Sequence, residues 1–169
     1  MKFIILLLIV IQLHSSEYLD ELLELKKDQR ELLWKIFLMA EKEAPHLKYV
    51  LPAIAWKESS FGIKTRSLGG NDLGVFQINI NTFANRYKSV ILEYDITTPE
   101  LKRILRSNFD LNFLAAKIEL DYWRTRFKSE QKIFQSYNGG TSNSHNSIEY
   151  GKDLVLRTKA IKQYIFLHQ

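Results

Sequence analysis

Apolar residues recur at steps of three and four along most of this chain, and this spacing constrains the fold more than any other feature. One series runs through residues 18–44 and stops before Pro45, and a second fills residues 47–60. Steps of this length place apolar side chains on one face of an α-helix. Further helices are predicted to start near Thr98 and Asp110. Strand-like alternation is nearly absent, so the sequence predicts a mainly α fold.

Glycine is concentrated in one segment, which interrupts the helical pattern. Residues 62–80 contain four of the seven glycines: Gly62, Gly69, Gly70 and Gly74. Such a segment is a loop, and any short β-hairpin is expected there. No repeat or linker divides the chain, and 169 residues with 46% hydrophobic side chains can fill one core. We therefore expect one domain over residues 17–169, with an N-terminal helix (17–44) and a core (45–169).

The first sixteen residues have the layout of an export signal. Lys2 precedes an unbroken apolar run over residues 3–11, and short polar residues follow up to Ser16. The run is shorter than the roughly 20 residues that a membrane-spanning helix needs. We expect residues 1–16 to direct the protein to the periplasm and to be removed, or to hold it at the cell envelope uncleaved. The chain contains no cysteine for a disulfide, a lipid anchor or a thiolate nucleophile.

The charge balance and the motifs that are missing exclude several classes of function. The chain has 24 Lys and Arg against 19 Asp and Glu, a net charge of +5, which suits an anionic polymer. No basic run interleaved with aromatic residues points to nucleic acid. The four histidines lack the spacing of metal ligands, and the serine-hydrolase Gly-x-Ser-x-Gly motif is absent. The sequence therefore predicts no metal, no cofactor and no nucleic-acid partner.

Several short segments contain residues suited to carbohydrate chemistry. Glu58 ends a strongly apolar helix, where burial and the negative end of the helix dipole both raise the pKa of a carboxyl group. A carboxyl that keeps its proton near neutral pH can act as a general acid. The following loop carries amide side chains, among them Gln77 and Asn79, that match acetamido and hydroxyl groups. Each segment taken singly also has an ordinary explanation as a turn, a helix cap or a solvated carboxylate.

Together, in order and spacing, these segments resemble the lytic transglycosylases with a goose-type-lysozyme-like domain, over most of residues 45–161. That family has a Glu-Ser pair at a helix end, a Gly-x-x-Gln turn, a Tyr-Asn-x-Gly element and a tyrosine opening a late helix. The matching segments are Glu58-Ser59, Gly74-Val75-Phe76-Gln77, Tyr137-Asn138-Gly139-Gly140 and Tyr150. Asn112 also resembles a family position. The turn departs from the usual Gly-Leu-Met-Gln, and Ser136 replaces the usual alanine before Tyr137.

The resemblance implies a lysozyme-like fold and an enzyme that cuts peptidoglycan glycan strands. The bond between N-acetylmuramic acid and N-acetylglucosamine would be broken without water, which leaves 1,6-anhydro ends. Glu58 would act first as acid and then as base, and Tyr150 would orient it. Substrate would be bound by six residues, Ser59, Gly74, Gln77, Asn79, Tyr137 and Asn138. The expected partners of this monomer are peptidoglycan and a secretion, conjugation or other envelope-spanning complex.

Two other interpretations stay open at this point. If Asp72 faces the same groove it could activate water, and the protein would be a hydrolytic muramidase. The two carboxyl groups would then lie roughly 6.5–9.5 Å apart. Alternatively, a catalytically silent accessory protein of an envelope machine would keep the groove and bind peptidoglycan without turnover.

Overall fold

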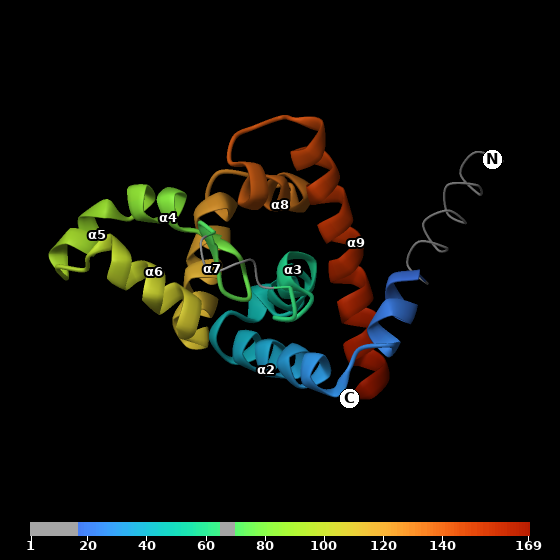
Figure 1. Ribbon diagram of the computed structural model, residues 1–169. Helices are drawn as coiled ribbons and strands as arrows, with labels where there is room; N and C mark the ends of the chain where they lie inside the picture. The colour runs from blue at the N-terminus through green and yellow to red at the C-terminus, as the bar shows by residue number, and fades with distance from the viewer. Residues whose placement is uncertain (1–16, 65–69) are drawn as a thin grey trace.

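The computed structural model describes residues 17–64 and 70–169, and most of them are helical (Figure 1). After a helix over residues 17–23, the elements are α2 (Lys27–Glu43), the 3₁₀ turn η1 (Pro45–Leu47), α3 (Val50–Ser59), β1 (Asp72–Leu73), β2 (Ile78–Asn79), α4 (Ile80–Arg86), α5 (Lys88–Glu93), α6 (Thr98–Ser107), α7 (Phe109–Arg124), α8 (Glu130–Gly139) and α9 (His145–His168). The mainly α prediction is confirmed, with one small hairpin inside residues 62–80. Among these described helices, none has the length and apolar character needed to cross a membrane.

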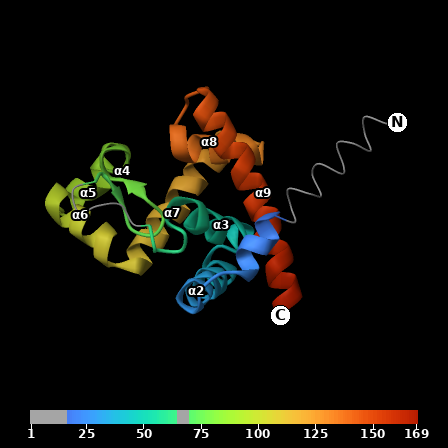
Figure 2. The same cartoon turned by 45° about the vertical axis from the view of Figure 1, so that its right-hand side comes forward.

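Helix α3 lies at the centre of the core because it is apolar on almost every side. Residues 50–56 and Ser59 are all buried. A helix that is apolar all round is stable only when other elements surround it. Helices α2 and α9 pack directly on α3, and Figure 1 shows it inside a frame of α2, α7, α8 and α9. In both Figure 1 and Figure 2, α4, α5 and α6 project to one side of this frame. The last turn of α3 is therefore held firmly by its neighbours.

The single helix expected over residues 18–44 is divided in two at residues 24–26. Leu25, inside the break, is buried, and the Gln29 side chain accepts a hydrogen bond from the Lys26 backbone N–H at 3.0 Å. The spacing of apolar residues alone would continue the first helix. Burial of the intervening leucine and this local cap begin a new helix instead.

The short helix over residues 17–23 is bound to α9 and α3. The Tyr18 hydroxyl donates a hydrogen bond to Asp153 on α9, and the Tyr18 ring meets the Trp56 ring edge-on with 5.7 Å between centroids. The Arg157 guanidinium lies 4.2 Å from the centre of the Trp56 ring and bonds Asp153 at 3.0 Å. The first helix is thus part of the packed domain.

The hairpin turn depends on glycine at its first position. Strands β1 and β2 pair antiparallel, with Leu73 opposite Ile78. Gly74 follows β1 with φ +71°, a left-handed conformation that side chains disfavour. A Cβ atom at Gly74 would also lie only 2.4 Å from the Asn112 side chain. The approach of α7 therefore explains why this position is a glycine, and the predicted role of Gly74 in binding substrate stays a prediction.

Asn112 on α7 holds this turn in place. Its side chain is 1% exposed, donates to the Leu73 carbonyl at 2.9 Å and accepts from the Phe76 N–H at 3.1 Å. We expect Asn112→Ala to lower the free energy of unfolding by about 3 kcal/mol, because two buried backbone groups lose their partners. Urea denaturation followed by circular dichroism measures this change. Asn85→Ala, at an exposed position on α4, is the matched control. Equal stability of the two variants would contradict this account of the turn.

Candidate active site

Glu58 is positioned by the way in which α3 ends. Ser60 and Phe61 both adopt left-handed backbone conformations, with φ of 48° and 55°. The Ser60 N–H bonds the Trp56 carbonyl at 2.9 Å, which caps the last turn. Gln29 on α2 donates to the Ser60 carbonyl at 3.1 Å and fixes this cap to the rest of the core. The half-buried Glu58 side chain consequently projects from a rigid helix end.

Tyr150 on α9 contacts Glu58 directly. Its hydroxyl donates to Glu58 Oε1 at 2.5 Å, and the residue is 8% exposed. Burial raises the pKa of Tyr150 well above its ordinary value of 10, and the negative charge of Glu58 raises it further. The hydroxyl therefore keeps its proton and remains a donor throughout the physiological pH range. A donor of this kind orients a carboxyl group and stabilises its ionised form.

Three side chains from three helices hold the hairpin turn opposite Glu58. Ser59 ends α3, is 0% exposed, and its hydroxyl lies 2.8 Å from the Val75 carbonyl oxygen. Tyr137 on α8 donates to the Phe76 carbonyl at 3.0 Å. Asn112 supplies the third connection, from α7. The turn thus has a fixed distance and orientation relative to the catalytic candidate.

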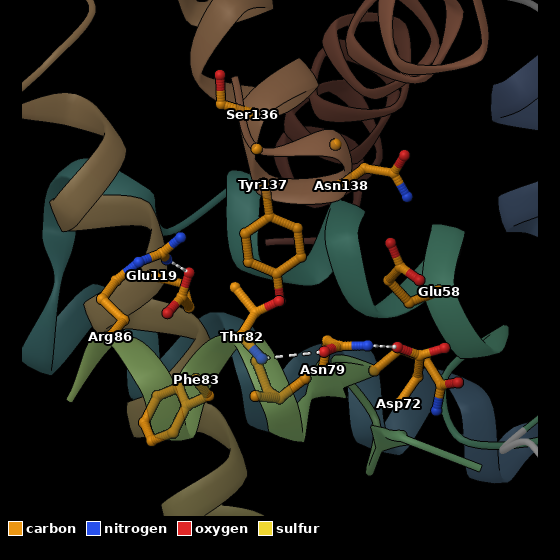
Figure 3. Close-up of a pocket in the computed structure, with 14 residues that line it drawn as sticks. Glu58, Asp72, Asn79, Thr82, Phe83, Arg86, Glu119, Ser136, Tyr137 and Asn138 are labelled. Carbon is orange, nitrogen blue, oxygen red and sulfur yellow. Dashed lines mark hydrogen bonds and ion pairs between the residues drawn. The ribbon is translucent and has the colours of Figure 1, made fainter. Parts of the chain in front are cut away.

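The groove between these elements has a volume of about 410 Å³, within the size range of ligand sites. Figure 3 shows Glu58 on one side of the Tyr137 ring. In that view Asp72 lies below Glu58, and Asn79 lies below the Tyr137 ring. Arg86 and Glu119 lie on the other side of that ring. The walls therefore come from α3, the hairpin, α4, α7 and α8.

Five of the eight predicted site residues line this groove, namely Glu58, Gln77, Asn79, Tyr137 and Asn138. Tyr150, on α9, hydrogen-bonds Glu58. The family resemblance implied that this tyrosine orients the acid. Ser59 and Gly74 do not line the groove. That they bind substrate therefore stays a prediction. The Ser59 hydroxyl points into the protein, where it also accepts the Gly62 N–H at 2.8 Å.

Gln77 combines an unusual backbone conformation with an open acceptor. Its φ is 48°, and its Nε2 donates to the Gly74 carbonyl at 2.7 Å, which orients the amide. Its Oε1 is buried and makes no hydrogen bond within residues 17–64 and 70–169. An oxygen held in this way on a groove wall can accept an N–H or O–H from a ligand.

Asn79 is engaged in holding the fold, although it lines the groove. Its Nδ2 donates to Asp72 Oδ1 at 2.9 Å, and its Oδ1 caps α4 by accepting the Thr82 N–H at 3.1 Å. Figure 3 shows both interactions as dashed lines. Asp72 lines the same groove as Glu58, as the hydrolytic interpretation requires.

Sequence reasoning missed Arg86 and Glu119, which form an ion pair on the groove wall. Burial raises the pKa of Glu119, while the Arg86 guanidinium acts in the opposite direction. A signal was available, because Glu119 stands seven residues after Asn112 and so shares the buried face of α7. A carboxyl group on a buried helix face is uncommon and usually has a partner. In the described ranges, no three His, Asp or Glu side chains gather closely enough to hold a metal ion.

Comparison with known proteins places the chain in a family. It is 33% identical over 120 residues, 69% of this chain and 63% of the other, to an uncharacterized 20.7 kDa protein of the vs-regB intergenic region of Enterobacteria phage T4. The match thus spans less than two thirds of that relative. No solved structure matches the chain significantly. The sequence model of the transglycosylase SLT domain matches residues 35–157, which include the Glu58 helix end, the hairpin turn, Tyr137-Asn138 and Tyr150. The chain therefore belongs to the transglycosylase SLT domain family and has its lysozyme-like fold.

Proposed function

We propose that this protein is a lytic transglycosylase that cuts peptidoglycan between N-acetylmuramic acid and N-acetylglucosamine. The supporting observation is the position of Glu58, on a groove at a rigid helix end, hydrogen-bonded at 2.5 Å by a tyrosine that keeps its proton. Membership of the SLT family supports the same class of reaction and substrate.

In the proposed reaction, protonated Glu58 donates its proton to the glycosidic oxygen. The C1–O bond of the muramic acid breaks, and the acetamido oxygen of the same sugar bonds to C1. Glu58, now a carboxylate, takes the proton from the C6 hydroxyl of that sugar. The C6 oxygen then bonds to C1 and displaces the acetamido oxygen, which closes the 1,6-anhydro ring. One carboxyl group acts in turn as acid and base, and no water is consumed.

Tyr150 and Gln77 have separate roles in this proposal. The Tyr150 hydrogen bond strengthens when Glu58 becomes ionised, so it stabilises the state that follows proton donation. Gln77 Oε1, an acceptor on the groove wall, would take the N–H of the acetamido group and direct its oxygen toward C1. Asn138, exposed at the end of α8, would contact the strand at the rim of the groove.

Product analysis tests the proposal against its main rival, a hydrolytic muramidase. The observation that favours hydrolysis is that Asp72 lines the groove together with Glu58. Purified sacculi are digested with the full chain, and the soluble muropeptides are separated and weighed by mass spectrometry. We expect products with 1,6-anhydro ends, each lighter by one water than a reducing end. Reducing ends alone would identify a muramidase. No release of muropeptides, with sacculi still bound, would favour a silent accessory protein.

We also propose that the protein acts from the periplasmic side of the cell envelope, with a secretion, conjugation or similar complex as partner. The support for the location is the basic and apolar start of residues 1–16, which lie outside the described residues. Fractionation of expressing cells, followed by sequencing of the N-terminus, tests the location. Recovery in the cytoplasm with residues 1–16 still attached would contradict it.

A further inference from the structure

The Arg86–Glu119 pair lies in the groove but is remote from the chemistry just described. In Figure 3 it is on the opposite side of the Tyr137 ring from Glu58. Arg86 ends α4 and Glu119 lies in α7, so the pair joins the projecting helices to the core. Both residues nevertheless line the groove.

The guanidinium of Arg86 lies over two aromatic rings. Its central carbon lies 4.0 Å from the centre of the Tyr122 ring and 4.9 Å from that of Trp123. Cation–π contacts of this kind restrict where the guanidinium and its five N–H donors can lie. Arg86 bonds Glu119 through Nη1 and also bonds Tyr87, and a guanidinium with five N–H donors has others to offer a ligand.

Arg86 and Tyr87 both hydrogen-bond the Glu119 carboxyl group, yet one of its two oxygens makes no hydrogen bond within the described residues. In the part of the chain that the structure describes, three buried side-chain polar atoms make no hydrogen bond: Gln77 Oε1, Glu119 Oε1 and Ser136 Oγ. All three residues line this groove. Buried polar atoms are nearly always paired, because leaving one unpaired costs free energy. Glu119 itself is only 8% exposed. Its open oxygen is best explained as an acceptor for a donor that arrives with the ligand.

The two side chains together define the chemistry of that ligand. A carboxylate accepts and a guanidinium donates, so the pair matches a group that has one N–H and one carbonyl oxygen side by side. A secondary amide is such a group. Ligand anions would be repelled by Glu119 and cations by Arg86, so a neutral partner is favoured. We propose that Arg86 and Glu119 form an amide-binding subsite of the groove, in which Glu119 Oε1 accepts the amide N–H and Arg86 donates to its carbonyl oxygen.

This inference rests on the proposed function, because peptidoglycan offers such amides from two sources. Its sugars carry acetamido groups, and its stem peptides contain peptide bonds. Occupation of the subsite would hold the glycan strand at a second point, away from the cleaved bond. Substitution here is therefore expected to weaken binding, while proton transfer at Glu58 is untouched.

The test measures binding with turnover removed by Glu58→Gln. Isothermal titration compares that chain with one that also carries Arg86→Gln and Glu119→Gln, a neutral pair that can still bond across the same contact. The ligands are an N-acetylglucosamine tetramer, glycan strands stripped of peptide, and strands with their stem peptides. Lys117→Gln, which removes a cation bonded to Asp121 on the same helix and outside the groove, is the matched control.

We expect the neutral pair to weaken binding at least tenfold, with the Lys117 variant unchanged. Weaker binding of all three ligands assigns the subsite to acetamido groups, and weaker binding of the peptide-bearing strands alone assigns it to stem peptides. Unchanged affinities with a lower melting temperature would show that the pair serves only the fold, and would overturn the inference. If the Glu58→Gln chain binds none of the ligands and the unsubstituted chain releases no product, the proposed function fails as well.

A second measurement needs no substitution at the pair. The Nε–Hε resonance of Arg86 is followed by NMR in the otherwise intact Glu58→Gln chain during titration with the tetramer and then with peptide-bearing strands. A saturable shift with either ligand supports the subsite. A resonance that stays fixed while the rest of the groove responds would refute it.

Discussion

Glu58→Gln is expected to reduce kcat/KM on peptidoglycan by about 10³-fold or more, because the variant can neither donate the proton nor take one back. Glutamine keeps the volume of the side chain and still accepts the hydrogen bond from Tyr150. The fold should therefore be preserved, and strand binding should remain. Release of soluble muropeptides from sacculi measures turnover, and the thermal melting curve checks the fold.

Glu43→Gln is the matched control for this variant. Glu43 is exposed at the end of α2, so its substitution removes one negative charge outside the groove. We expect its rate to equal that of the unsubstituted protein. If Glu58→Gln retained a tenth or more of the activity, Glu58 would not be the catalytic acid.

Tyr150→Phe is expected to lower kcat by about 10- to 100-fold while KM changes little, because the hydroxyl acts on Glu58 and not on the sugar. The aromatic ring remains, including its contact with Lys57 Nζ at 5.6 Å. The lost hydrogen bond stabilised the ionised carboxylate. The limb of the pH–rate profile in which activity falls with rising pH should therefore move to higher pH.

The shifted profile separates a positioning role from a structural one. A purely structural tyrosine would lower the melting temperature or the amount of active protein and leave the pH profile in place. Tyr94→Phe, at an exposed tyrosine beyond α5, is the control and should change neither property. A Tyr150→Phe enzyme with the original profile and rate would show that this hydroxyl does not act on Glu58.

Helix starts could be predicted from the sequence to within one or two residues. A start was expected near Thr98, and α6 begins there, capped by the hydroxyl of Thr97, which accepts the Glu100 N–H at 3.4 Å. The start expected at Asp110 is capped by Asn108, which accepts the Leu111 N–H at 3.0 Å. Neighbouring polar side chains compete for the same cap, and packing of the first turn decides between them.

The ends of helices were harder to interpret than their starts. Glu58 and Ser59 are adjacent, yet the first lines the groove and the second is fully buried. Successive side chains on a helix point about a quarter turn apart. Which one meets the groove depends on where α9 and the hairpin pack, and this is long-range information. A sequence motif that contains both residues therefore cannot tell which of them lines the groove.

The Arg86–Glu119 contact could not be predicted from local pattern. The two residues are 33 positions apart and come from helices that no spacing rule connects. In the sequence, Arg86 has the features of an ordinary basic residue in the last turn of a helix. Only the fold, which brings the end of α4 to the Glu119 side chain on α7, makes it part of a groove wall.

The most direct test of the account is the fate of water oxygen during cleavage. Sacculi are digested with the purified protein in water labelled with heavy oxygen, and the new glycan ends are analysed by mass spectrometry. With Glu58 as acid and then base and the C6 hydroxyl as nucleophile, the ends should be 1,6-anhydro sugars without label. Labelled reducing ends that form at the same rate as cleavage would show that water is the nucleophile and would contradict the account.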